Sequence, residues 1–266
     1  MSNNSLFALS LNPGGKQTIL LLHGIFSSHL EYANVVPFLS DHHLLAVDLP
    51  RHSRSAHVRP FQLPAAAEHV AEVIRTQAQN CRAHVVGLSG GGFVALELSK
   101  RHPDLVESLF VTGASPFTGW TKWLAEHPGI LYYCIASFVK YCPDWLYRKM
   151  CSWGGLLPHD DLRMEMKKNL NKDLLAEGYG SMVKFTKADI CLITARTLTM
   201  AGGLQDDVEA TREMGKVLRG KCPESKAAVV KGAVHAWNLQ FPELFATAVR
   251  TWIGGFDSPE GLEELL

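Results

Sequence analysis

The chain has 266 residues with 26 basic and 26 acidic side chains, and hydrophobic residues make up 47% of it. This apolar fraction excludes intrinsic disorder, which requires low hydrophobicity and a high net charge. A formal net charge of zero argues against a nucleic-acid binder, because such a protein needs a basic face. The longest nearly apolar run, 130–139, is too short for the roughly 20 residues that cross a bilayer.

The first ten residues lack the basic start and long apolar stretch of a signal peptide. We therefore expect a soluble, cytoplasmic protein. The six cysteines form no Cys-x-x-Cys pair, so no zinc or redox motif is predicted, and we interpret them as reduced core residues. We expect no metal ion and no organic cofactor. The oligomeric state is left open.

Short apolar runs alternate with helical patterns along the chain, which is typical of parallel βαβ units. The predicted strands are Thr18–Leu22, Leu44–Val47, His84–Val86, Leu109–Thr112, Thr197–Ala201 and Ala227–Val230. The predicted helices are Glu31–Leu39, Ala65–Gln79, Gly91–Arg101, Val208–Arg219 and Pro242–Ile253. We expect the C-terminal run 258–266 to form a surface turn.

The segment from Pro116 to Thr186 interrupts this alternation, because it shows helical stretches and no strand pattern. It contains half of the 24 aromatic residues in about a quarter of the chain. Such enrichment favours a helical insertion that covers an apolar cavity, although the rings could equally form the insertion's own core. We predict a core domain of residues 1–115 and 187–266, with residues 116–186 inserted as a cap.

The strongest local signal is the pentapeptide Gly87-Leu88-Ser89-Gly90-Gly91. It follows a predicted strand and opens a predicted helix, which is the setting of a nucleophile elbow. A serine on such a sharp turn needs neighbours without side chains, and Gly87 and Gly91 meet that need. We predict that Ser89 is a catalytic nucleophile.

A serine hydroxyl is a weak nucleophile and needs a base. His235 follows the last predicted strand of the parallel sheet, where such sheets place catalytic groups. Seven other histidines stand in polar or turn-like surroundings and are expected on the surface: His42, His43, His52, His57, His102, His127 and His159. His69 and His84 fall inside a predicted helix and a predicted strand, where a structural role is expected.

The imidazole needs a carboxylate partner that orients it and stabilises its cationic form. Asp206 and Asp207 both follow the predicted strand Thr197–Ala201 and precede a predicted helix. Either position makes the chain order Ser, Asp, His. We favour Asp206 as the acid and keep Asp207 as the alternative, and expect the other to be a helix cap.

The backbone after Leu22-His23-Gly24 is expected to face the acyl oxygen. We predict an oxyanion hole formed by the N–H groups of Ile25 and Gly90. Phe26 is the weaker candidate for the first donor. His23 is expected only to brace the loop through hydrogen bonds.

These motifs resemble those of the α/β-hydrolase fold family over nearly the whole domain. The shared landmarks are the His23-Gly24 loop, Asp48-Leu49-Pro50 with Ser53 and Ser55, the elbow at Ser89, Gly203 to Asp206, and His235. The resemblance implies an α/β fold with a mostly parallel, eight-stranded sheet, helices on both faces, and a helical cap between strands six and seven. The chain is similar to uncharacterised fungal members, some of which act in secondary metabolism.

Two departures from the family pattern stand out. The family's Asp-x-x-Gly-His-Gly-x-Ser motif begins here at Asp48, but Arg51 and Ser53 replace its glycines, so we expect a reshaped loop. Only about 17 residues precede the first strong strand, so the sheet is expected to be shortened at its N-terminus. The two antiparallel strands that normally open the fold are expected to be shortened, or one to be missing, and Leu6–Leu11 is the candidate for one of them. Asp48 itself is expected to be structural.

We therefore predict a serine hydrolase that cleaves an ester, thioester or lactone with a bulky apolar portion through an acyl-enzyme. Its partner is a small-molecule substrate. We assign substrate binding to five aromatic residues: Phe26, Phe117, Trp120, Trp123 and Trp237. Two alternatives remain: a carbon–carbon bond hydrolase or cyclase that uses the same triad, and a small-molecule receptor with slow turnover.

Overall fold

The computed structural model describes residues 5–157 and 159–266. In these ranges eight strands form one sheet in the order β1-β3-β2-β4-β5-β6-β7-β8, with antiparallel edge strands β1 and β8 and parallel pairs between them. The strands are β1 (Ala8–Leu11), β2 (Thr18–Leu22), β3 (His43–Val47), β4 (Ala83–Leu88), β5 (Val106–Thr112), β6 (Thr197–Gly202), β7 (Lys226–Val230) and β8 (Leu262–Glu264).

This sheet confirms the predicted fold class, and each of the six predicted strands is present with small changes at its ends. The short β1 lies inside Leu6–Leu11, as the shortened N-terminus required. The expectation of a C-terminal surface turn is wrong, because residues 262–264 form β8 and pair with β7. This pairing covers the edge of β7 that would otherwise expose its backbone groups.

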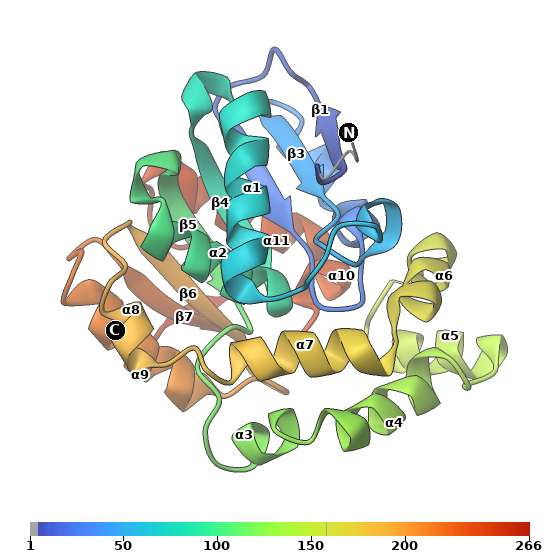
Figure 1. The fold of residues 1–266 in the computed structure, drawn as a ribbon. Coiled ribbons are helices and arrows are strands. Elements are labelled where there is room, and N and C mark those ends of the chain that lie inside the picture. Colours follow the sequence, from blue (N-terminus) through green and yellow to red (C-terminus); the bar gives the residue numbers. More distant parts are fainter. Residues whose placement is uncertain (1–4, 158) are drawn as a thin grey trace.

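Helices cover both faces of the sheet (Figure 1). One face carries α1 (Leu63–Gln77), α2 (Gly90–Arg101), α8 (Lys187–Ile190) and α9 (Val208–Arg219), and the other carries α10 (Trp237–Gln240) and α11 (Pro242–Gly254). Successive strand residues point to opposite faces, so Leu20 and Leu22 of β2 enter one buried cluster whereas Ile19 and Leu21 enter the other. Burial on both faces explains why the strands are continuous apolar runs.

Of the helices described between β5 and β6, the five that precede α8 lie at one end of the sheet (Figure 1): α3 (Gly119–Ala125), α4 (Pro128–Val139), α5 (Asp144–Trp153), α6 (Asp160–Asn169) and α7 (Lys172–Met182). They occupy the segment predicted as a cap, and α7 packs against both α1 and α2. Residues 1–4 of the predicted core and residue 158 of the predicted cap lie outside the described ranges.

Two local expectations are wrong. The predicted helix Glu31–Leu39 is replaced by two short 3-10 helices, η1 (His29–Tyr32) and η2 (Val36–Leu39). Pro37 has no N–H and is tolerated only in the first turn of a helix, so a new helix starts there and none runs through it. Of the six cysteines, only Cys151 is buried, although all are free thiols. The remaining 3-10 helices are η3 (Ser53–Ser55), η4 (Gln79–Cys81) and η5 (Pro103–Leu105). No helix in the described ranges has the length and apolar character needed to cross a bilayer.

Candidate active site

Ser89 occupies the single-residue turn between β4 and α2, with φ of 53° and ψ of −119°. This conformation is sparsely populated for residues other than glycine, and such strain costs about 1–3 kcal/mol. The Ser89 N–H donates to the Thr112 carbonyl oxygen at 2.8 Å, which ties the turn to the end of β5. The hydroxyl makes no hydrogen bond to any described residue, His235 included.

The glycines around Ser89 are required by close backbone approach. A Cβ atom on Gly87 would lie 2.6 Å from the Gly91 carbonyl oxygen. A Cβ atom on Gly91 would lie 2.2 Å from the Leu22 carbonyl oxygen. The two outer glycines of the pentapeptide thus let β4, α2 and the end of β2 meet at the serine.

His235 lies in the loop after β7 and pairs with Asp206, which lies in the loop after β6. The distance from His235 Nδ1 to Asp206 Oδ1 is 2.5 Å. A carboxylate can only accept here, so Nδ1 carries the proton and Nε2 is left as the potential base. The other carboxylate oxygen of Asp206 accepts from the Gly202 N–H at 2.7 Å, and the Asp206 side chain is only 8% exposed.

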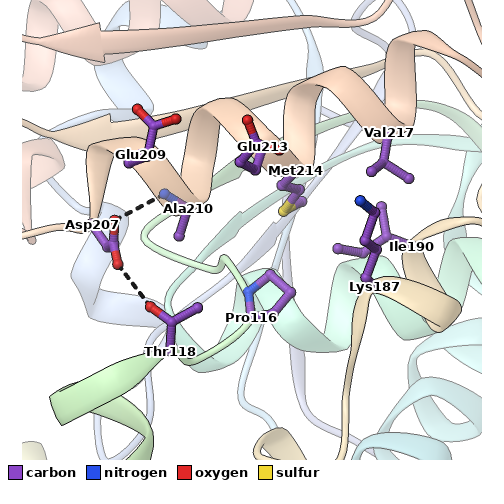
Figure 2. A pocket seen from close by; sticks show the side chains of 10 residues that line it. All are labelled: Pro116, Thr118, Lys187, Ile190, Asp207, Glu209, Ala210, Glu213, Met214 and Val217. Atoms are coloured by element: carbon purple, nitrogen blue, oxygen red, sulfur yellow. Dashed lines mark hydrogen bonds between the residues drawn. The ribbon is translucent and has the colours of Figure 1, made fainter.

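Asp207 does not contact His235 in this structure. Its Oδ1 accepts from the Ala210 N–H at 2.9 Å and caps α9, and its Oδ2 accepts from the Thr118 hydroxyl at 3.1 Å (Figure 2). The two neighbouring aspartates therefore make different contacts. Asp206 hydrogen-bonds the His235 imidazole, whereas Asp207 caps α9 and accepts a hydrogen bond from Thr118, near the start of the 116–186 segment.

Gly113 lies between the Ser89 turn and the His235 ring. It follows Thr112, which bonds the Ser89 N–H, and a Cβ atom on Gly113 would lie 2.5 Å from His235 Cε1. Burial lowers the pKa of His235, but the hydrogen bond to Asp206 and the negative charges of Asp206 and Glu31 outweigh it and raise the pKa. The charged form of His235 is therefore stabilised relative to that of a free imidazole, which helps a group that accepts a proton.

Two backbone N–H groups converge beside Ser89. A Cβ atom on Gly90 would lie 3.0 Å from the Ile25 nitrogen, so the peptides that begin at these residues are adjacent. The Ile25 N–H has no acceptor among the described residues. Phe26, the weaker candidate donor, has a φ of 58° and its N–H donates to His52 Nε2 at 2.9 Å. Its N–H is therefore already occupied.

His23 and His52 brace this loop as neutral imidazoles. Each donates from Nδ1 to a backbone carbonyl, of Gly24 and Pro50 respectively, and each accepts a backbone N–H at Nε2. Burial is the main cause that lowers the pKa of His23 to about 4 and that of His52 to about 3. The surface location expected for His52, His42 and His43 is wrong, because all three are buried.

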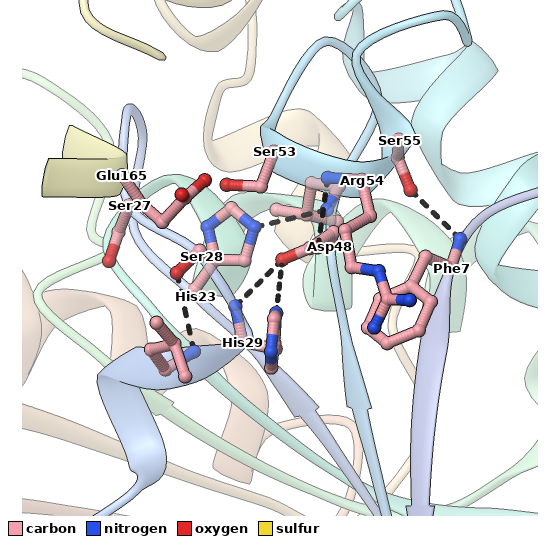
Figure 3. Close-up of polar contacts among 12 residues, drawn as sticks. Phe7, His23, Ser27, Ser28, His29, Asp48, Ser53, Arg54, Ser55 and Glu165 are labelled. Carbon is pink, nitrogen blue, oxygen red and sulfur yellow. Dashed lines mark hydrogen bonds and ion pairs between the residues drawn. The ribbon is translucent and has the colours of Figure 1, made fainter. Parts of the chain in front are cut away.

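Asp48 lies behind the loop in a fully buried polar cluster (Figure 3). It accepts from the backbone N–H and Nδ1 of His29 at 2.8 and 2.9 Å, and from the Arg54 N–H at 3.2 Å. Burial acts to raise the pKa of Asp48, but the bonds from His29 and the nearby His23 hold it below its usual value. Both carboxylate oxygens of Asp48 therefore already accept hydrogen bonds, and these contacts link the chain after β3 to η1.

The loop at Arg51 and Ser53 keeps a glycine-like backbone despite the replaced glycines. Their φ values are 67° and 44°, in the region that favours glycine. The new side chains instead reach the cap segment. Arg51 forms an ion pair with Glu177 of α7 at 2.6 Å, and the Ser53 hydroxyl accepts from Asn169 of α6 at 2.9 Å.

Asn169 is a site neighbour that sequence reasoning missed. It is buried, and its amide also donates to the Ser27 carbonyl oxygen at 2.7 Å, while its oxygen accepts the Ser53 N–H. Thus α6 is bonded to the loop that carries Ile25. Nothing in the local sequence signals this contact, because the partners are more than 100 positions apart.

The five aromatic residues predicted to bind substrate are placed differently from one another. Phe117 lines a hollow of about 180 Å³ together with His235, Asp206 and Gly113. Its ring stacks on Phe93 at a centroid distance of 5.5 Å. Phe26 is partly buried against the core. Trp120 and Trp123 stack on each other at 4.6 Å with side chains that are 69% and 39% exposed.

Trp237 is not positioned to line a substrate cavity. It is completely buried among Phe110 and Phe245 on the sheet face opposite α1 and α2, and its indole N–H donates to the Thr112 hydroxyl at 2.8 Å. The start of α10 directs this ring into the core although His235 is only two residues away. Trp237 therefore belongs to the hydrophobic core and contacts the end of β5 through Thr112.

A second, larger pocket of about 320 Å³ adjoins the hollow at His235, since Pro116 and Asp207 line both (Figure 2). Figure 2 shows apolar side chains from α8 and α9 pointing into it, and carboxylates at its border. The apolar lining residues are Pro116, Ile190, Ala210, Met214 and Val217.

Comparison with known proteins agrees with this architecture. Residues 19–248 match the family described as "Alpha/beta hydrolase family". An "AB hydrolase superfamily protein" of Gibberella zeae is 30% identical, over 99% of this chain and 89% of that protein. A "Pimeloyl-[acyl-carrier protein] methyl ester esterase" of Neisseria meningitidis serogroup A is 29% identical, over 94% of this chain and 81% of that protein.

Solved structures show the same fold at lower identity. An esterase from Exiguobacterium antarcticum superposes with a TM-score of 0.72 and 17% identity, covering 94% of this chain and 95% of that one. A thermophilic esterase from Thermogutta terrifontis superposes with a TM-score of 0.70 and 18% identity, covering 94% and 93%. The family match spans well over half of the sequence, and the chain belongs to the α/β-hydrolase family.

Proposed function

We propose that the protein is a serine hydrolase that cleaves an ester, thioester or lactone with a bulky apolar portion. The observations that carry the proposal are the His235–Asp206 pair, which leaves Nε2 as the potential base, and a serine in a strained turn that Thr112 and Gly113 link to the His235 ring. The methyl ester esterase among the relatives supports ester cleavage. In this role Ser89 is the nucleophile, His235 the general base and Asp206 the residue that orients it.

The reaction would proceed in two stages. Ser89 Oγ attacks the acyl carbon while its proton passes to His235 Nε2, and the N–H groups of Ile25 and Gly90 donate to the oxyanion. His235 then returns the proton to the leaving group, which leaves an acyl group on Ser89. Water attacks this ester by the reverse route and regenerates the serine.

The apolar portion of the substrate is proposed to lie along Phe117 and in the pocket between α8 and α9. That pocket adjoins the hollow at His235 and has an apolar floor. Three carboxylates, of Asp207, Glu209 and Glu213, line it against one ammonium group, that of Lys187, so the excess of negative charge favours a neutral chain over a fatty carboxylate. The proposed cap over residues 116–186 would close this side of the site.

A panel of p-nitrophenyl esters from acetate to decanoate tests the function and the pocket together. We expect the native protein to hydrolyse these esters and to prefer acyl chains longer than acetate. Ala210→Phe should shift this preference toward shorter chains, because the larger ring fills the pocket. Ala176→Phe, at an exposed position of α7, should leave the preference unchanged. The same preference in both variants would contradict the assigned pocket. Turnover of no ester despite tight binding of a small molecule would favour a receptor.

A further inference from the structure

Glu31 is a buried carboxylate next to the proposed site that the two-stage reaction does not use. It lies in η1, within a helical stretch expected to be ordinary, and is 6% exposed. Its Oε2 accepts from the Gly24 N–H at 2.7 Å. Its own carbonyl oxygen accepts from the Asn238 side chain at 3.1 Å, so both ends of the residue are held.

Only one glycine separates this carboxylate from the nucleophile. A Cβ atom on Gly24 would lie 3.6 Å from Ser89 Cβ and 3.8 Å from each carboxylate oxygen of Glu31. The next residue after Gly24 is Ile25, whose N–H is the proposed oxyanion donor. The Glu31 side chain therefore holds the peptide that precedes this donor.

The charged groups around Glu31 are few. His235 acts on it as a positive charge, and Tyr32 is the titratable neighbour along η1. The Tyr32 hydroxyl donates to the Leu22 carbonyl oxygen, and His29 pairs with Asp48, so neither neutralises Glu31. Burial raises the pKa of Glu31 to about 7. The hydrogen bond from the Gly24 N–H, the Ser27 hydroxyl and the positive charge of His235 lower this pKa but are outweighed by burial.

We propose that Glu31 is a second carboxylate of the proposed active site, a positioning residue that holds the His23–Gly24 peptide, directly before the Ile25 N–H, and stabilises the imidazolium form of His235. The proposal rests on the proposed function. When Glu31 is ionised, its charge favours the imidazolium that forms as Ser89 loses its proton. When Glu31 is protonated, that stabilisation is lost. Activity thus depends on two coupled protonations, of Glu31 and of His235, on the acid side.

The test compares native protein with Glu31→Gln through the pH profiles of kcat and kcat/KM for p-nitrophenyl butyrate. The glutamine amide oxygen can still accept from Gly24, so the variant removes mainly the charge. We expect kcat to fall about tenfold, less than the 10²–10³ that loss of an oxyanion donor costs, with KM nearly unchanged. In the native protein the fall in activity at low pH should depend on two protonations, and in Glu31→Gln on one. The midpoint of this fall should also move roughly 0.5 pH unit or more lower, because loss of the negative charge lowers the pKa of His235.

Glu97→Gln is the matched control. Glu97 is a carboxylate of α2 that is equally buried and paired with Lys100 and Arg101. Its replacement should lower stability and leave both pH profiles unchanged. Glu31→Asp keeps the charge but shortens the reach to Gly24, so it should retain the dependence on two protonations with a reduced kcat. If Glu31→Gln does not fold, the kcat and the pH profile of Glu31→Asp test the proposal instead.

A pH profile of Glu31→Gln identical to the native one, or a rise in KM with kcat preserved, would overturn the proposal. So would native kcat in Glu31→Asp. These outcomes differ from failure of the proposed function itself. In that case native protein would neither hydrolyse the ester nor react with a fluorophosphonate, whereas Glu31→Gln is expected to keep reacting, only more slowly.

Discussion

Ser89→Ala is expected to abolish ester hydrolysis, with a fall in kcat of up to about 10⁶-fold, judged from serine proteases. The variant removes the only proposed nucleophile and leaves the two oxyanion donors and His235 in place. Its rate is measured with the p-nitrophenyl ester that native protein cleaves fastest, at saturating concentration, so that the comparison concerns kcat.

The fold should tolerate this substitution. The Ser89 hydroxyl makes no hydrogen bond to the described residues, and alanine accepts the same strained turn with no new clash. The unfolding free energy is therefore expected to stay within about 0.5 kcal/mol of native. Residual activity above one per cent in this folded variant would show that another group attacks the substrate.

Asp206→Asn is expected to reduce kcat by about 10⁴-fold, as loss of the triad acid does in serine proteases. The reason is visible in its two hydrogen bonds. One oxygen must still accept from the Gly202 N–H, so the new amide group turns toward His235 Nδ1. This amide group donates, which forces the ring proton to Nε2 and removes the base from Ser89.

Asp207→Asn is the matched control for this prediction. Asparagine caps helices about as well as aspartate, and its oxygen can keep the bond to the Ala210 N–H. We expect its kcat to remain within about twofold of native, in line with a surface substitution. Equal losses in the two variants would contradict the assignment of Asp206, and a larger loss in Asp207→Asn would reverse it.

The parts of the fold that depend on local pattern could be predicted from the sequence. The strands are apolar runs because each is buried on both faces, and the elbow is recognisable because Gly87 and Gly91 must be adjacent to backbone. The helix α9 begins at Val208 as expected, since the cap residue Asp207 precedes it.

The parts that depend on distant contacts could not be predicted. His52 stands in a turn-like sequence, yet it is buried because its ring accepts the Phe26 N–H. Trp237 is two residues from His235 in sequence, but a short helix directs its ring into the hydrophobic core on the opposite face of the sheet. Glu31 looked like one residue of an amphipathic helix, and only the folded loop brings its carboxylate to Gly24.

The measurement that most directly tests the central claim is mass spectrometry of the intact protein after treatment with a fluorophosphonate, followed by mapping of the modified peptide. An activated serine reacts with this reagent because it is both nucleophilic and paired with a base. We expect one adduct per chain, located on Ser89, and none in Ser89→Ala. No adduct in the folded native protein, or an adduct on another residue, would contradict the assignment of Ser89 as the nucleophile.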